Sequence, residues 1–67
     1  MMDVHVNGDT RRVPDGSTVA DVLAAAWGDA KGIAVALDGE VVQRGRWSDV
    51  VVRDGARMEI MTAVQGG

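Results

Sequence analysis

The chain has 67 residues, no cysteine and a formal net charge of −3. This length allows one domain and no second one, and the missing cysteine excludes disulfides, a thiolate nucleophile and cysteine metal ligands. An acidic chain is a poor partner for nucleic acid or an anionic membrane. No purely apolar run, Ile33–Leu37 included, is long enough for a membrane span, and the early Asp3 is unlike a signal peptide. We therefore expect a cytoplasmic protein.

The first segment predicts a β-hairpin. Met2, Val4 and Val6 alternate with polar residues, which is the period of a half-buried strand. Asn7-Gly8 is a two-residue turn signal because both positions favour positive φ. The return strand is expected over residues 9–13, and Pro14-Asp15-Gly16 predicts a further turn.

A helix is expected from Val19 to about Trp27. Thr18 and Asp21 have the spacing of a capping box, with Ser17 as the competing cap. Gly28 is well placed to end the helix. One apolar stripe, wide enough to lie on a sheet, consists of Val19, Val22, Leu23 and Ala26.

The second half predicts another hairpin and a final strand. Ile33–Leu37 and residues 40–42 are expected to pair across an Asp38-Gly39 turn. Residues 43–49 are expected to form a loop, and residues 50–52 a short strand. The last strand covers residues 57–64, with Met58, Ile60 and Thr62 on one face and Glu59, Met61 and Ala63 on the other.

These elements predict a mixed sheet of four to five strands with one helix. A single short helix covers only one face of a sheet, so the other face should meet solvent or a partner. The last strand is expected between the two hairpins, parallel to the first strand at the centre of the sheet. We expect one domain over residues 1–64 and a flexible tail over residues 65–67.

The tail Gln65-Gly66-Gly67 suggests a carried acyl group. A glycine thread passes where a side chain would not fit, and the last four residues extend to roughly 13 Å. Its chemical handle is the terminal carboxylate of Gly67. A carboxylate is a poor electrophile and needs activation, typically as an acyl-phosphate or acyl-adenylate. The tail therefore predicts that another protein supplies ATP and the chemistry.

The closing run from Met58 to Gly67 closely resembles the end of the ThiS family, the sulfur carriers of bacterial thiamine biosynthesis. The run Val35–Val42 followed by Arg44 and Trp47, and the Asn7-Gly8 turn, are also similar to that family. The resemblance implies an α+β, β-grasp (ubiquitin-like) fold. Two departures are Asp38, where the family commonly has Asn, and Gln43-Arg44-Gly45, where it often has Pro-Arg-Ser.

The resemblance also implies a mechanism. A ThiF-like partner adenylates Gly67 with ATP and magnesium, and sulfur from a cysteine desulfurase converts it to a thiocarboxylate. A ThiG-like thiazole synthase then receives the sulfur. Gln65 and Gly66 would thread into the partner's active site. The chain itself would bind no cofactor and would not be an enzyme.

Three other functions remain open at this stage. The same carrier chemistry would serve molybdopterin, cysteine or tRNA thiolation. A ubiquitin-like modifier would use the same ending, although Lys31 is the only lysine available for self-conjugation. A passive interaction domain would have an inert tail.

Other residues have competing interpretations. Met61, Ala63 and Val64 are a possible partner surface, or Met61 packs against the loop that contains Trp47. His5 without cysteine neighbours indicates a solvated strand face rather than a metal site. We identify no catalytic residue and no metal ligand. Trp27 and Trp47 are both interpreted as anchors at the edge of the core.

Overall fold

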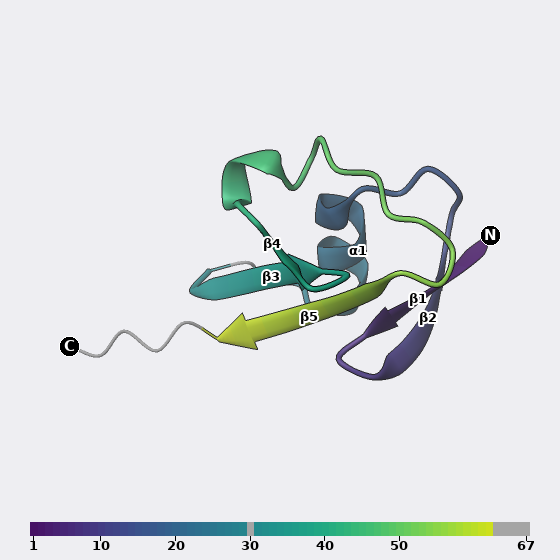
Figure 1. The fold of residues 1–67 in the computed structure, drawn as a ribbon, viewed down its shortest axis with the longest axis horizontal. Helices are drawn as coiled ribbons and strands as arrows, with labels where there is room; N and C mark the ends of the chain where they lie inside the picture. The colour runs from purple at the N-terminus through teal and green to yellow at the C-terminus, as the bar shows by residue number, and fades with distance from the viewer. Residues whose placement is uncertain (30, 63–67) are drawn as a thin grey trace.

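The computed structural model describes residues 1–29 and 31–62, and within them it contains five strands and one α-helix (Figure 1). A short 3₁₀ helix, η1 (Arg44–Arg46), precedes the last strand. The elements in chain order are β1 (Met2–Val6), β2 (Asp9–Val13), α1 (Val19–Ala26), β3 (Ile33–Leu37), β4 (Glu40–Val42) and β5 (Arg57–Thr62).

The five strands form one mixed sheet in the order β2-β1-β5-β3-β4. The first and last strands run parallel at its centre, with His5 opposite Arg57. β5 runs antiparallel to β3, where Ala36 lies opposite Glu59. The expected topology is therefore confirmed, and β5 lies between the two hairpins (Figure 1).

Both hairpins turn through left-handed residue pairs. Asn7 and Gly8 have φ of 49° and 88°, and Asp38 and Gly39 have φ of 50° and 88°. Asparagine, aspartate and glycine tolerate this conformation better than other residues. The sequence signals for these two turns are confirmed.

The capping box fixes the start of α1. The Thr18 hydroxyl accepts a hydrogen bond from the Asp21 N–H at 3.2 Å, and the Asp21 carboxylate accepts one from the Thr18 N–H at 3.0 Å. Ser17 is not the cap, because its hydroxyl donates to the Pro14 carbonyl at 2.6 Å. The helix ends at Ala26, one residue earlier than expected, and Gly28 follows with φ of 95°.

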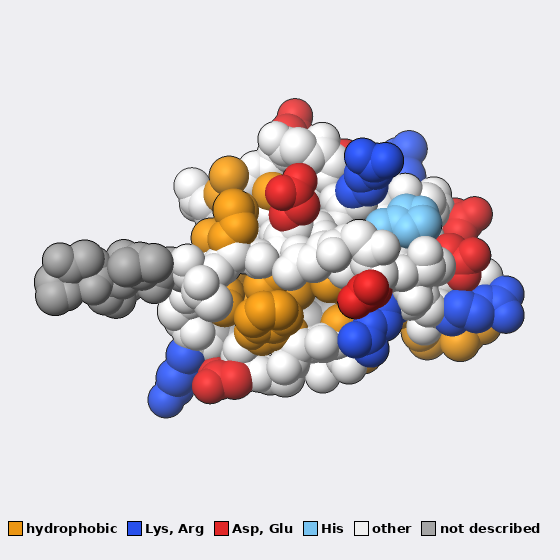
Figure 2. All heavy atoms as spheres, turned by 90° about the horizontal axis from the view of Figure 1, so that it is seen from below, with side chains coloured by type: hydrophobic (Ala, Val, Ile, Leu, Met, Phe, Trp, Pro, Cys, Tyr) orange, Lys and Arg blue, Asp and Glu red, His pale blue; other side chains and the backbone are white. Residues whose placement is uncertain are grey.

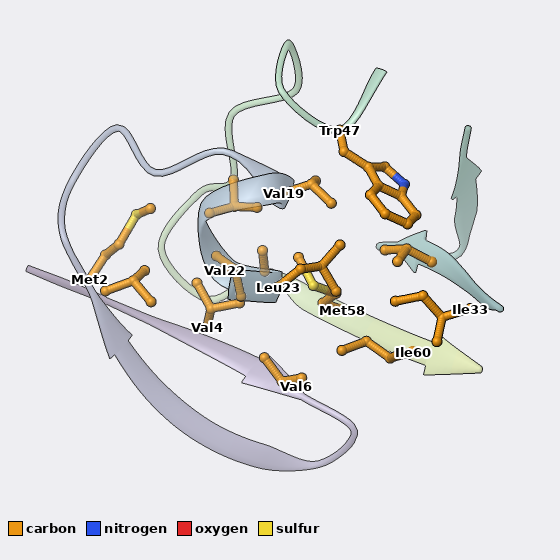
Figure 3. Close-up of a cluster of buried hydrophobic side chains, with 14 residues drawn as sticks. Met2, Val4, Val6, Val19, Val22, Leu23, Ile33, Trp47, Met58 and Ile60 are labelled. Atoms are coloured by element: carbon orange, nitrogen blue, oxygen red, sulfur yellow. The ribbon is translucent and has the colours of Figure 1, made fainter. Parts of the chain in front are cut away.

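The hydrophobic core lies between α1 and one face of the sheet (Figure 3). Trp47 brings the loop after β4 into this core and is only 6% exposed. Its ring N–H donates to the Val42 carbonyl at 2.9 Å, and the Arg44 guanidinium lies 4.8 Å from the ring centroid. The most deeply buried side chains are Val4, Val19, Val22, Val35, Val52 and Met58.

Two expectations about the core and its surroundings are wrong. Trp27 is 42% exposed and is not part of the core cluster, because it follows the last residue of α1 with φ of −120° and leaves the apolar stripe. Residues 50–52 form no strand in the sheet; Val51 makes an isolated bridge with Thr18. The Val19 N–H donates to the Val50 carbonyl and the Val52 N–H donates to the Ser17 carbonyl, both at 2.9 Å, so this segment pairs with the start of α1.

Candidate functional site

Of the residues expected at the functional site, the structure describes Met61 alone. Gly67, Gly66 and Gln65 lie outside the described residues, as do Ala63 and Val64. The structure therefore describes strand β5, the part of the fold that precedes the predicted tail. We call this strand the base of the tail.

Neighbouring strands hold β5 on both sides. Toward β1, the His5 N–H donates to the Ala56 carbonyl at 2.8 Å, and the Asn7 N–H donates to the Met58 carbonyl at 2.9 Å. Toward β3, the pairing runs without a break from Met58 opposite Leu37 to Thr62 opposite Ile33. A central strand with this support is among the most firmly held parts of a small domain.

The side chain of Asn7 extends this support beyond the end of β1. Its amide oxygen accepts a hydrogen bond from the Ile60 N–H at 2.7 Å, and its amide nitrogen donates to the Ile60 carbonyl at 3.2 Å. The side-chain amide thus pairs with both polar backbone groups of Ile60, as a residue of a neighbouring strand would. The sequence identified Asn7 as a turn residue and did not reveal this second contact.

Corresponding contacts hold the start of β5. The Asp38 carboxylate accepts a hydrogen bond from the Arg57 N–H at 2.9 Å, and the Asp38 N–H donates to the Arg57 carbonyl at 2.8 Å. Residues of both hairpin turns therefore contact β5, Asp38 near its beginning and Asn7 near its end.

The sheet face opposite α1 is apolar near the end of β5. Met61 is 43% exposed and lies opposite Ala34 on β3, and Val41 of β4 is 71% exposed opposite Ala36. Met61 is not part of the core cluster that contains Trp47. The alternative in which Met61 packs against the Trp47 loop therefore finds no support, and Met61 is accessible to a partner.

The same face is charged near the start of β5. Arg57 lies beside His5, and Glu59 follows two residues later. His5 Nδ1 is 3.0 Å from the Thr10 hydroxyl. Figure 2 shows the one histidine and most of the charged side chains of that view in the half away from the C-terminal end of β5.

The described residues contain neither a metal-binding cluster nor a membrane-spanning helix. Residues 1–29 and 31–62 contain no group of three or more histidine, aspartate or glutamate side chains arranged to hold a metal ion. In the same residues, no helix has the length and apolar character needed to cross a membrane.

Comparison with known proteins assigns the chain to a family. The model of the ThiS family matches residues 4–67, which is nearly the whole chain and includes Gln65, Gly66 and Gly67. The chain belongs to the ThiS family. The resemblance seen in the sequence is thereby confirmed.

Solved structures of another ThiS protein agree with this fold. The crystal structure of the thiamine biosynthesis protein ThiS from Geobacter metallireducens is 30% identical in sequence and superposes with a TM-score of 0.85, covering 98% of this chain and 100% of that one. A solution NMR structure of a thiamine biosynthesis protein from the same organism is 29% identical with a TM-score of 0.75, covering 98% of this chain and 88% of that one. The β-grasp fold expected from the sequence is therefore confirmed.

A curated relative is a larger protein. A thiazole synthase of Paramagnetospirillum magneticum is 30% identical over 66 residues, which is 98% of this ThiS-family chain and 20% of the synthase. The chain thus spans about a fifth of the length of this curated relative.

Proposed function

We propose that this ThiS-family chain is a sulfur carrier that delivers sulfur on the carboxyl group of Gly67 to thiazole formation in thiamine biosynthesis. The observation that carries the proposal is the family match, because it extends through Gly67 and covers the reactive end as well as the folded body. In this role the chain is a co-substrate of other enzymes and does not itself catalyse a reaction.

The proposed chemistry has three steps. A ThiF-like enzyme uses ATP and magnesium to join the Gly67 carboxylate to AMP and releases pyrophosphate. The terminal sulfur of a cysteine desulfurase persulfide then attacks the acyl carbon and expels AMP, which gives an acyl disulfide. A second thiol breaks the sulfur–sulfur bond, becomes disulfide-linked to the desulfurase cysteine, and leaves a thiocarboxylate on Gly67. A reducing cytoplasm suits this thiol chemistry.

The structure supports this role through the contrast between β5 and the tail sequence. Hydrogen bonds hold β5 on both sides as far as Ile60. Gln65, Gly66 and Gly67 follow, and the two glycines have no side chains to obstruct a narrow channel. A firmly held base limits the directions in which the carboxylate is presented, which lowers the entropic cost of productive binding.

Thiazole synthase is the recipient that we propose. The curated thiazole synthase contains a segment similar to this chain within one polypeptide. Joining a donor to its acceptor raises their effective concentration, so such a fusion is expected where the two act together. We therefore propose that this chain delivers sulfur to a ThiG-like thiazole synthase.

ATP–pyrophosphate exchange tests the adenylation step. The purified chain, a ThiF-like enzyme, magnesium-ATP and labelled pyrophosphate are combined, and label entering ATP is measured. A chain lacking Gly66 and Gly67 is the matched control, since it retains every described residue. We expect exchange that depends on the full-length chain. Equal exchange with the truncated chain, or none with either, would contradict the proposal.

A further inference from the structure

Asn7 performs two separable tasks in the fold. Its backbone adopts φ of 49° and turns the chain from β1 into β2. Its side-chain amide reaches across to β5 and pairs with the N–H and the carbonyl of Ile60. Asparagine is common in such turns for its backbone alone, so the turn does not account for the side-chain pairing.

The side-chain contact lies where backbone support from β1 stops. The last backbone hydrogen bond from this side is donated by the Asn7 N–H to the Met58 carbonyl. Beyond it, in the part of the chain that the structure describes, the Asn7 amide makes the remaining hydrogen bonds to β5 from the β1 side, at Ile60. Without that amide, residues 60–62 would be paired along β3 alone.

We propose that Asn7 is a positioning residue for the C-terminal carboxylate. This inference rests on the proposed carrier function. The amide of Asn7 fixes the end of β5 on its second side, seven positions before Gly67. The strand therefore leaves the domain in a restricted direction, and the adenylating enzyme binds a tail whose base is already ordered. If the contact is lost, the adenylating enzyme must also order the end of β5 when it binds the tail, and the entropy lost in that ordering weakens binding.

The second hairpin provides a matched comparison. Asp38 has nearly the same φ, 50°, and also contacts β5 through its side chain, but at Arg57. Arg57 is the first residue of β5 and Ile60 the fourth. The two turns therefore offer equivalent substitutions at opposite ends of one strand.

The experiment compares Asn7→Gly with Asp38→Gly in the full-length chain. Glycine accepts positive φ, so each turn is retained while its side-chain hydrogen bonds are lost. Thermal melts first set a temperature well below both unfolding transitions. The ATP–pyrophosphate exchange assay with the ThiF-like enzyme then gives kcat and the KM for each carrier variant, and amide hydrogen exchange is followed at Ile60.

We expect Asn7→Gly to raise the KM roughly three- to tenfold while kcat stays within about twofold, because the lost contact affects binding and not the bound complex. The Ile60 amide should exchange faster. Asp38→Gly should leave the KM near the wild-type value. An unchanged KM for Asn7→Gly, or an equal rise for Asp38→Gly, would overturn the inference.

Failure of the proposed function gives a different result. In that case the wild-type chain itself supports no exchange of pyrophosphate. The amide exchange of Ile60 still decides whether Asn7 orders the end of β5, and protection in Asn7→Gly equal to that in the wild type would overturn the positioning role on its own.

Discussion

Met58 and Met61 lie on the same strand and have the same side chain, but they face opposite sides of the sheet. Met58 is 1% exposed and packs in the core beneath α1, whereas Met61 is 43% exposed on the uncovered face. A domain with one eight-residue helix covers only one face of its sheet. The comparison shows how one strand contributes to the core through one face and leaves the other face exposed.

The largest expected effect is on the covered face. Met58→Ala removes a fully buried side chain and should lower the free energy of unfolding by about 2–4 kcal/mol. A 67-residue domain has little stability to lose, so the urea midpoint should fall steeply. A loss below about 1 kcal/mol would show that the core rearranges to fill the cavity.

The two tryptophans offer the same comparison of a buried and an exposed side chain, outside β5. Trp47→Phe removes the ring N–H that donates to the Val42 carbonyl and should cost about 1–2 kcal/mol in urea unfolding. Trp27→Phe is the control, because Trp27 is 42% exposed and should change stability by less than about 0.5 kcal/mol. Equal losses of unfolding free energy in both variants would contradict the assignment of Trp47, and not Trp27, to the core.

The helix that covers the sheet depends on its cap. Thr18→Ala removes the hydroxyl that accepts from the Asp21 N–H and should cost about 1 kcal/mol of stability. Thr18→Ser keeps the hydroxyl and should retain most of the wild-type stability. Thermal denaturation followed by circular dichroism compares the two, and similar losses in both would exclude the capping bond as the cause.

The smallest effect on stability is expected on the open face. Met61→Ala should change the free energy of unfolding by less than about 0.5 kcal/mol. We expect the same variant to weaken binding to the adenylating enzyme severalfold, because exposed apolar side chains supply contact area at interfaces. Isothermal titration calorimetry measures this affinity. Unchanged affinity would remove Met61 from the partner surface.

Local sequence signals were sufficient for most of the fold. Asn7-Gly8 and Asp38-Gly39 specify turns through residues that tolerate positive φ, and the Thr18–Asp21 spacing specifies the start of α1. The strand order could be predicted because a compact sheet covered by one helix places the last strand between the two hairpins. These features depend on neighbouring residues or on simple packing.

The features that the sequence did not reveal are contacts between distant residues. Asn7 pairs with Ile60, 53 positions away, and no local pattern distinguishes this amide from one that only makes a turn. Val51 bridges Thr18 and not another strand, because the residues at the start of α1 offer free backbone groups. The prediction for Gln65, Gly66 and Gly67 came from glycine chemistry and family resemblance, and it stays a prediction because they lie outside the described residues.

The most direct test of the carrier proposal is the mass of the intact protein, purified without reductant from cells that contain its proposed partners. Replacing one oxygen by sulfur adds roughly 16 Da, and fragmentation distinguishes this change on Gly67 from oxidation of a methionine. We predict sulfur on Gly67. A terminus without sulfur, when a desulfurase and an adenylating enzyme are co-expressed, would contradict the carrier role.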